Sequence, residues 1–175
     1  MTFRAGNSMI TTDGQMCLDT PYNALERLLP LFAWKYGTLG YEFWGADWLT
    51  RNPFEWGIHK VHSQADTPGI YQRIRYPNGA GYIFYPGQCG EKIISSIRLE
   101  SMRDGMEDYS CYVLLEKLAR KTGDPEAQNL LETAKAFVPV PNAGGRKSEL
   151  LLPEPERFVQ FRDRIGMAIE RFSAD

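Results

Sequence analysis

The chain has 175 residues, of which 43% are hydrophobic and 24% are charged, and its formal net charge at pH 7 is −2. This composition excludes an intrinsically disordered protein and predicts one soluble domain with a substantial core. The scattered lysines and arginines also exclude the basic footprint of a nucleic-acid-binding protein, so we expect no nucleic-acid partner.

Membrane and redox signals are equally limited. No apolar run approaches the roughly 20 residues of a membrane-spanning helix, and the first residues, MTFRAGNSMITT, lack the apolar stretch of a secretion signal. We therefore expect no membrane partner, and the cellular compartment stays unknown. Three widely spaced cysteines without a C-x-x-C pattern predict reduced thiols rather than a disulfide framework or a zinc site.

The first third of the chain predicts a strand, a helix and a second strand. A weak strand is expected over 7–12, and a helix then starts with Thr20 as its cap and Pro21 at its first position. Gly37 is placed to end this helix, and Pro30 predicts a kink within it. The helix carries a stripe that we expect to be buried, made of Leu25, Leu28, Leu29, Phe32 and Tyr36.

Residues 39–44 begin two positions after Gly37, and their pattern predicts a buried strand. A helix, a short link and a strand with little polar alternation are typical of a parallel sheet covered by helices. Residues 45–78 are then expected to form a long connection rich in aromatic side chains. Loops of that length inside compact domains are usually functional.

The remaining chain predicts one more strand and three helices. The strand is expected over 81–85, and the helices over 96–121, 125–137 and 155–172. Gly123 is placed just past the first of these helices. The last helix shows one apolar side, formed by Phe158, Phe161, Ile165 and Ile169.

Three parallel strands with covering helices are too few for a closed barrel, since an eight-stranded α/β barrel needs on the order of 250 residues. We therefore predict an α/β fold that is the carboxyl-terminal portion of a (β/α)8 barrel and is incomplete. A small open sheet is the alternative. Residues 1–123 would form the last βα units, and residues 124–175 would form helices that pack on the same domain.

Three segments carry a resemblance to a known family: YEFWGADW from Tyr41, YPNGAGYIFYPG from Tyr76 and SSIRLESMRDGMEDY from Ser95. Over roughly residues 18–118 the chain resembles the glycoside hydrolase family 123 catalytic domain and a related family catalogued as a domain of unknown function. One departure is visible. Relatives usually read N-G-D-G where this chain has Ala80 in the third position, and loss of that carboxylate puts a polar role of the loop in doubt.

The resemblance implies a substrate class and a mechanism. Members are similar to β-N-acetylgalactosaminidases, in which the acetamido oxygen of the substrate attacks the anomeric carbon. An adjacent Asp-Glu pair assists: the Asp orients the acetamido group and the Glu is the general acid. This chain contains no Asp followed directly by Glu, so we predict no catalytic residue within it, no cofactor, and a carbohydrate partner carrying N-acetylated hexosamine.

The nearest imitation of that pair is Glu107-Asp108, which falls within a predicted helix. Arg103 lies four residues before Glu107 and three after Glu100, so local ion pairs explain these charges. A catalytic carboxylate pair needs two acids facing each other across a cleft, about 5 to 10 Å apart. We therefore interpret Glu107-Asp108 as structural.

Trp44, Asp47 and Trp48 are better placed, because they lie at and just beyond the carboxyl end of a strand, where barrel substrates sit. An indole face matches the C–H face of a pyranose, and a carboxylate can hold a sugar hydroxyl. The alternative is that both indoles pack under the long loop.

Glu42 and Tyr85 complete the predicted substrate-binding residues. Glu42 shares a strand face with Trp44, and if that face looks into a barrel, burial would raise its pKa. Its alternative role is a structural partner for an arginine. Tyr85 ends the third strand and could donate its hydroxyl to a substrate, or it could be a hydrogen-bonded core tyrosine.

His59 and His62 form an H-x-x-H pattern, which can share a metal only on a helix, and no third ligand has a persuasive spacing. We therefore predict no metal site. The function predicted from the whole sequence is part of a glycoside hydrolase-like domain that is inactive alone. The alternative is a non-catalytic carbohydrate-binding or scaffold module. An open barrel would also expose strand edges, so either the missing amino-terminal part of the barrel or self-association is expected to cover them.

Overall fold

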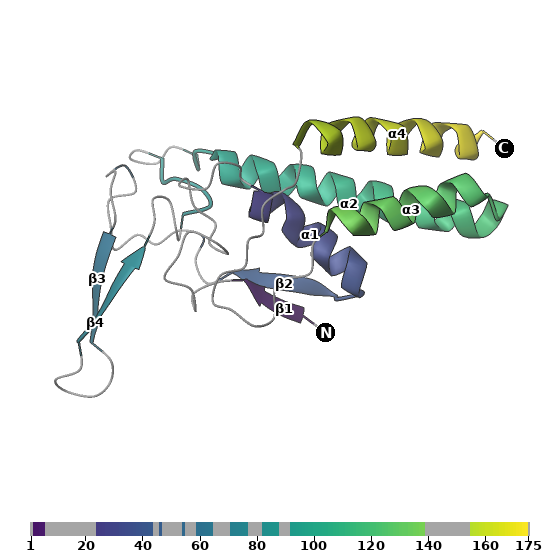
Figure 1. Cartoon of the computed structure of the whole chain (residues 1–175). Helices are drawn as coiled ribbons and strands as arrows, with labels where there is room; N and C mark the ends of the chain where they lie inside the picture. Colours follow the sequence, from purple (N-terminus) through teal and green to yellow (C-terminus); the bar gives the residue numbers. More distant parts are fainter. Residues whose placement is uncertain are drawn as a thin grey trace.

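The computed structural model describes residues 2–5, 24–43, 46, 54, 59–64, 71–76, 82–87, 92–138 and 155–174. Within these ranges the helices are α1 (Ala24–Tyr36), α2 (Ile97–Thr122), α3 (Pro125–Phe137) and α4 (Pro155–Ser173). The strands are β1 (Thr2–Ala5), β2 (Gly40–Phe43), β3 (His59–Gln64) and β4 (Tyr71–Tyr76). Figure 1 shows the helices gathered at one end of the molecule, with α1 between α2 and the β1–β2 pair.

Helix α1 ends as the sequence predicts. Gly37 adopts a left-handed conformation with φ 61°, which costs a glycine little because it has no Cβ. Its N–H donates to the carbonyl of Trp34 at 3.2 Å, and the N–H of Thr38 donates to the carbonyl of Ala33 at 2.9 Å. These two bonds satisfy carbonyl groups that would otherwise lack partners at the end of the helix.

The predicted apolar stripe of α1 is confirmed at Leu28, Leu29 and Phe32, which are buried, but the expectation for Tyr36 was wrong. Tyr36 is 49% exposed. Its ring stacks on Phe32 with centroids 6.0 Å apart, and the Lys35 ammonium lies 5.5 Å from its centroid. At the last turn of the helix the tyrosine therefore covers the edge of the core instead of entering it.

Local capping chemistry sets the bounds of α2 and α3. Ser96 accepts a hydrogen bond from the N–H of Leu99 at 3.2 Å, and Gly123, with φ 68°, ends α2. Asp124 then accepts hydrogen bonds from two N–H groups in the first turn of α3, and Pro125 occupies the first position. The predicted helices over 96–121, 125–137 and 155–172 are confirmed to within two residues.

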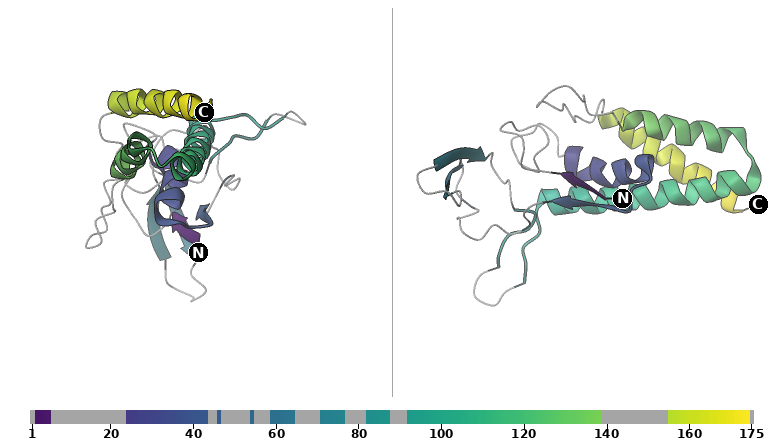
Figure 2. Two further views of the ribbon diagram at one scale, coloured as in Figure 1. Left: turned by 90° about the vertical axis from the view of Figure 1, so that its right-hand side faces the viewer. Right: turned by 90° about the horizontal axis from the view of Figure 1, so that it is seen from below.

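One apolar core joins all four helices. Phe137 of α3 packs edge-on against Phe158 of α4 with ring centroids 5.6 Å apart. The rings of Trp34 in α1 and Tyr112 in α2 also pack together, with centroids 4.8 Å apart. The two views of Figure 2 show α1 and α2 lying side by side, and α3 and α4 both pack on α2. The other core members are Leu28, Leu31, Phe32, Leu115, Ala119, Ala127, Leu130, Leu131, Ala134, Val138, Phe161, Ile165, Ala168 and Phe172.

A buried carboxylate ties three helices together inside this body. The side chain of Asp108 in α2 is 0% exposed and accepts from Arg27 Nε of α1 at 2.9 Å and from Arg162 Nε of α4 at 2.5 Å. We call this group the Asp108 clamp. Because both carboxylate oxygens bind a guanidinium, the charge is paired on both sides, as a buried charge must be to avoid a large desolvation cost.

The clamp also shifts the ionisation of its neighbours. Burial and the Asp108 charge raise the pKa of the Cys111 thiol and, more strongly, that of the Tyr112 phenol. Burial alone would lower the pKa of the Arg162 guanidinium, but the charge and hydrogen bond of Asp108 outweigh it and raise that pKa. The ion pairs that the sequence predicts for Arg103, with Glu100 at 2.7 Å and Glu107 at 3.8 Å, are confirmed.

The strands form two small pairs. β1 and β2 are parallel, with Arg4 opposite Glu42, and α1 connects them in sequence. The strand expected over 7–12 lies outside the described residues. β3 and β4 are antiparallel and form a hairpin within the predicted connection 45–78, where the sequence analysis names no strand. The hairpin projects away from the helices in Figure 1.

Candidate functional site

The first turn of α2 holds the segment that the sequence predicts as the third strand. The described part of this segment, residues 82–87, pairs Tyr85 with Ile94 in an isolated antiparallel bridge. The Ser96 hydroxyl donates to the carbonyl of Ile83, and Arg98 Nε donates to the carbonyl of Tyr82. Since Ser96 and Arg98 are buried, at 8% and 0% exposure, these bonds fix the segment from inside the protein.

Tyr85 lies between a cation and an aromatic ring. Arg98 Nη2 donates to the Tyr85 hydroxyl oxygen at 2.8 Å, and its guanidinium carbon lies 5.4 Å from the tyrosine centroid. The ring of Phe54 stacks on Tyr85 with centroids 5.4 Å apart and an interplanar angle of 23°. Phe54 is 67% exposed while Tyr85 is half-buried, so an aromatic surface reaches solvent directly beside a fixed hydroxyl. We call Phe54, Tyr85 and Arg98 the tyrosine site.

Arg98 occupies an unfavourable position for a cation. It is the second residue of α2, where the positive end of the helix dipole disfavours positive charge by about 0.3 to 1 kcal/mol. No carboxylate of the described residues pairs with it, and its Nη1 is buried without a hydrogen-bond partner among those residues. The hydrogen bonds of the guanidinium to the carbonyl of Tyr82 and the hydroxyl of Tyr85 offset this cost.

The nearby acids are already engaged. The Ser95 hydroxyl donates to Glu100 Oε1 at 2.5 Å, and Glu100 Oε2 pairs with Arg103 at 2.7 Å. Asp108 belongs to the clamp. Both acids are therefore paired with arginines in this arrangement.

Of the five predicted substrate-binding residues, Tyr85 is the one whose side chain the structure describes. Trp44, Asp47 and Trp48 lie outside the described residues, and so does the side chain of Glu42, whose backbone belongs to β2. The N–H of Ile83 donates to the carbonyl of Ala46 at 2.7 Å. This bond brings the segment that carries Tyr85 beside the chain three residues beyond β2.

Sequence reasoning missed Arg98 and Phe54 as members of the site. A usable signal for Arg98 existed, because an arginine in the first turn of a helix opposes the dipole and so needs another reason to be there. Phe54 carried no comparable signal, since it lies in the connection 45–78, for which no element was predicted, and contacts a residue 31 positions further along the chain.

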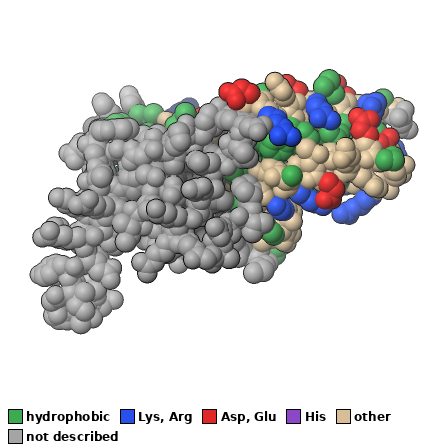
Figure 3. All heavy atoms as spheres, in the orientation of Figure 1, with side chains coloured by type: hydrophobic (Ala, Val, Ile, Leu, Met, Phe, Trp, Pro, Cys, Tyr) green, Lys and Arg blue, Asp and Glu red, His purple; other side chains and the backbone are tan. Residues whose placement is uncertain are grey.

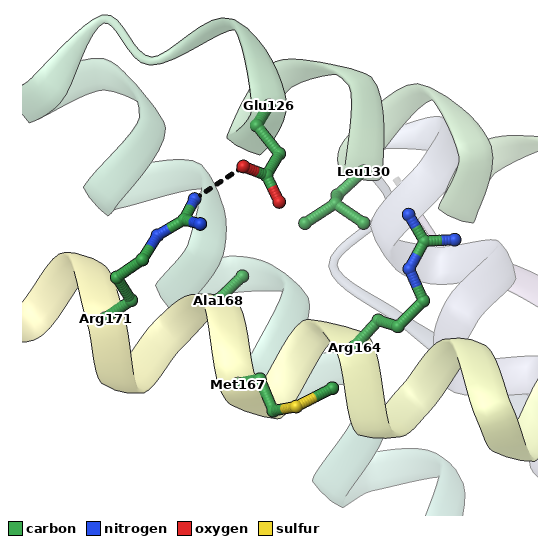
Figure 4. A pocket seen from close by; sticks show the side chains of 6 residues that line it. All are labelled: Glu126, Leu130, Arg164, Met167, Ala168 and Arg171. Carbon is green, nitrogen blue, oxygen red and sulfur yellow. Dashed lines mark hydrogen bonds and ion pairs between the residues drawn. The ribbon is translucent and has the colours of Figure 1, made fainter.

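A hollow of about 280 Å³ lies between α3 and α4. Figure 4 shows its lining, with Glu126 and Arg171 pointing toward each other; their ion pair measures 2.7 Å. The other lining residues are Leu130, Arg164, Met167 and Ala168. Its one carboxylate is therefore paired with an arginine.

Other classes of site find no support within the described ranges. These residues contain no group of three or more histidine, cysteine, aspartate or glutamate side chains suited to a metal ion. The backbone of His59 and His62 belongs to β3, not to the helix that a shared metal would need. None of the described helices is both long enough and apolar enough to cross a bilayer. On the face drawn in Figure 3, positive and negative side chains are interspersed over the helices.

Comparison with known protein families matches residues 22–115 to the glycoside hydrolase 123 catalytic domain. The chain belongs to this family. The match spans α1, β2, the hairpin, the tyrosine site and most of α2, and it confirms the resemblance that the sequence segments carry. Membership implies a glycosidase-type function in general. The search of curated proteins gave no match.

Proposed function

We propose that this glycoside hydrolase 123 domain handles N-acetylated hexosaminides and that the tyrosine site is part of its sugar-binding surface. The observation that carries the proposal is the exposed Phe54 ring stacked beside the Tyr85 hydroxyl, which Arg98 fixes. An aromatic face packs against the C–H face of a pyranose, and a directed hydroxyl recognises one sugar oxygen. Trp44, Asp47, Trp48 and Glu42 stay predicted members of the same surface.

The fold that we propose for this domain is a partial (β/α)8 barrel. Its support is the β1–α1–β2 unit, in which a helix connects two parallel strands, and the order of segment 82–85 followed by α2. In such a barrel the loops that follow the strands carry the substrate site. The tyrosine site fits this rule, because it joins the end of segment 82–85 to the start of α2.

We further propose that the chain alone binds the sugar without hydrolysing it. Substrate-assisted hydrolysis by the family's mechanism needs an Asp-Glu pair, and this sequence has none. Glu100 and Asp108 do not replace it, since Glu100 is bound by Ser95 and Arg103, and both Asp108 oxygens bind arginines. The alternative function, a non-catalytic carbohydrate-binding module, would also bind the sugar without hydrolysing it. It differs in that it would not be part of a larger catalytic domain.

Two assays on the purified chain test the proposal. Calorimetric titration with N-acetylgalactosamine is expected to show binding, and galactose to bind more weakly. Nitrophenol release from 4-nitrophenyl N-acetyl-β-galactosaminide is expected to equal the blank. Turnover by the pure chain would overturn the predicted inactivity, and absence of sugar binding would overturn the sugar site. Arg103→Gln, which alters an exposed arginine of α2, is the matched control for variants of the site.

The exposed apolar side chains support a partner for the isolated domain. Leu39, Ile93 and Ile97 are 89%, 63% and 57% exposed, and the latter two lie beside the tyrosine site. We propose that the remaining strands of a barrel cover them, and that the chain alone self-associates. Sedimentation analysis is expected to show dimers or larger species. A single monomer boundary with cooperative melting would contradict this proposal.

A further inference from the structure

Whether the Tyr85 hydroxyl donates or accepts a hydrogen bond, which we call its polarity, is set by the group that is hydrogen-bonded to its oxygen. A guanidinium has five N–H donors and no acceptor. In the bond of 2.8 Å between Arg98 Nη2 and Tyr85, the tyrosine oxygen must therefore accept. Its own O–H proton is left to donate elsewhere.

Arg98 is held so that this polarity cannot reverse. The side chain is fully buried, its Nε is bound to the carbonyl of Tyr82, and its guanidinium carbon lies 5.4 Å from the Tyr85 ring. Ser96, two residues earlier, anchors the adjacent carbonyl of Ile83 in the same way. Two neighbouring carbonyls and one hydroxyl are thus fixed by the first turn of α2.

We propose that Arg98 is a positioning residue that makes Tyr85 an obligate hydrogen-bond donor to an oxygen atom of the bound sugar. This inference rests on the proposed function and adds to it the polarity of one contact and the residue that dictates it. A tyrosine without such a partner accepts or donates equally well and orders its hydroxyl only on binding. With Arg98 in place, the donor is ready before the ligand arrives.

Binding measurements with N-acetylgalactosamine test the energetic side of the proposal. Tyr85→Phe is expected to weaken binding by about tenfold, the effect of one hydrogen bond. Arg98→Met is expected to weaken it by a similar factor in the wild-type chain but by little in the Tyr85→Phe background, because both changes remove the same contact. Arg98→Lys, which keeps a donor-only cation, is expected to retain most of the affinity.

A spectroscopic readout tests the polarity itself. The intensity ratio of the tyrosine Fermi doublet in the ultraviolet resonance Raman spectrum distinguishes a phenol that accepts a hydrogen bond from one that donates. The Tyr85 signal, isolated as the difference between wild type and Tyr85→Phe, is expected to report an acceptor in the free protein and to move toward the donor ratio when N-acetylgalactosamine binds. Arg103→Met, on the exposed side of α2, is the control and should leave both states unchanged.

The outcomes separate this inference from the proposed function. If the wild-type chain binds no N-acetylgalactosamine, both are wrong. If it binds the sugar but the Raman ratio stays constant, or Tyr85→Phe has no effect, the inference alone is wrong. If Arg98→Met lowers the sugar affinity equally in the wild-type and Tyr85→Phe backgrounds, the role of Arg98 is structural. Tyr85→Phe leaves the bond from Arg98 to Tyr82 intact, so it tests the contact without the folding defect that Arg98→Met could cause.

Discussion

The Asp108 clamp and the tyrosine site are both built on arginine side chains that donate hydrogen bonds to an oxygen, but they differ in how the arginine charge is paired. In the clamp, both oxygens of a buried carboxylate bind arginines, so the charges are matched within the protein. In the tyrosine site, a buried arginine has no carboxylate partner among the described residues and instead binds the hydroxyl of Tyr85, whose ring stacks on the exposed Phe54. The first arrangement stabilises the helical body, whereas we propose that the second presents the Tyr85 hydroxyl to a ligand.

Breaking the clamp is expected to have the largest effect on stability. Asp108→Ala removes the buried carboxylate that binds both Arg27 and Arg162, and leaves each arginine one more distant acid, Asp104 and Glu107 respectively. We expect a loss of about 2 to 4 kcal/mol in the free energy of unfolding, less than for a fully buried pair because Arg162 reaches solvent. Urea denaturation measures the loss. Glu132→Gln, which removes an exposed acid of α3 that pairs with Lys135, should change stability by under about 0.5 kcal/mol, and equal losses in the two variants would refute the special role of the clamp.

The close approach of α1 and α2 beside the clamp predicts an effect of intermediate size. A Cβ at Gly105 would overlap the carbonyl oxygen of Arg27 and lie 3.0 Å from its Cα, whereas a Cβ at Gly166 in α4 would meet nothing within 4 Å. Gly105→Ala should therefore cost about 1 to 3 kcal/mol through overpacking. Gly166→Ala should instead stabilise α4 by about 0.5 to 1 kcal/mol. Thermal melts of both variants check the opposite signs.

Alkaline pH offers a third way to probe the helical body. An ordinary tyrosine has a pKa of 10.0, and burial together with Asp108 raises that of Tyr112 in the fold. Above pH 10 the unfolded tyrosine ionises first, so the contribution of Tyr112 is complete below that pH and declines as pH rises. The decline is at most about 1.4 kcal/mol per pH unit. Urea midpoints between about pH 9 and pH 11 should fall less steeply for Tyr112→Phe than for wild type.

The smallest effect is expected at the border of the two regions. Ser96 caps α2 and also donates to Ile83, so Ser96→Ala should cost about 1 kcal/mol and loosen the segment that carries Tyr85. Asp124→Ala removes the cap of α3 at a similar cost without touching that segment. Sugar affinity should fall for Ser96→Ala and stay constant for Asp124→Ala. Equal affinities in the two variants would show that the segment is positioned independently of the cap.

The helices could be predicted from the sequence because their signals are local. Ser96, Gly123 and Asp124 cap and end helices through bonds within a few residues, and these bounds agree with the structure. The hairpin β3–β4 was missed because its strands carry few apolar residues, although Pro68-Gly69 between them is a turn signal. Tyr36 was misassigned because periodicity locates a helix face but not the edge of the core.

The candidate site could be predicted in part. Tyr85 was singled out because it ends the strand expected over 81–85; the structure instead gives residues 83 and 84 as bends, with Tyr85 in an isolated bridge to Ile94, and the sugar contact of Tyr85 stays a prediction. Its partner Arg98 and the stacked Phe54 depend on tertiary packing. The same holds for the clamp, where Asp108 meets arginines 81 and 54 residues away, while its sequence neighbours offer the more obvious ion pairs of Arg103.

The location of Arg162 matters for where the domain should be cut. The family match ends at residue 115, in the middle of α2, whereas the arginine that binds Asp108 Oδ1 belongs to α4. A recombinant fragment trimmed to the matched region would lack Arg162, one of the two arginines that bind Asp108. It would also lack the helix that packs on α2. Expression boundaries for this domain should therefore follow the packing of the last helix rather than the limits of family similarity.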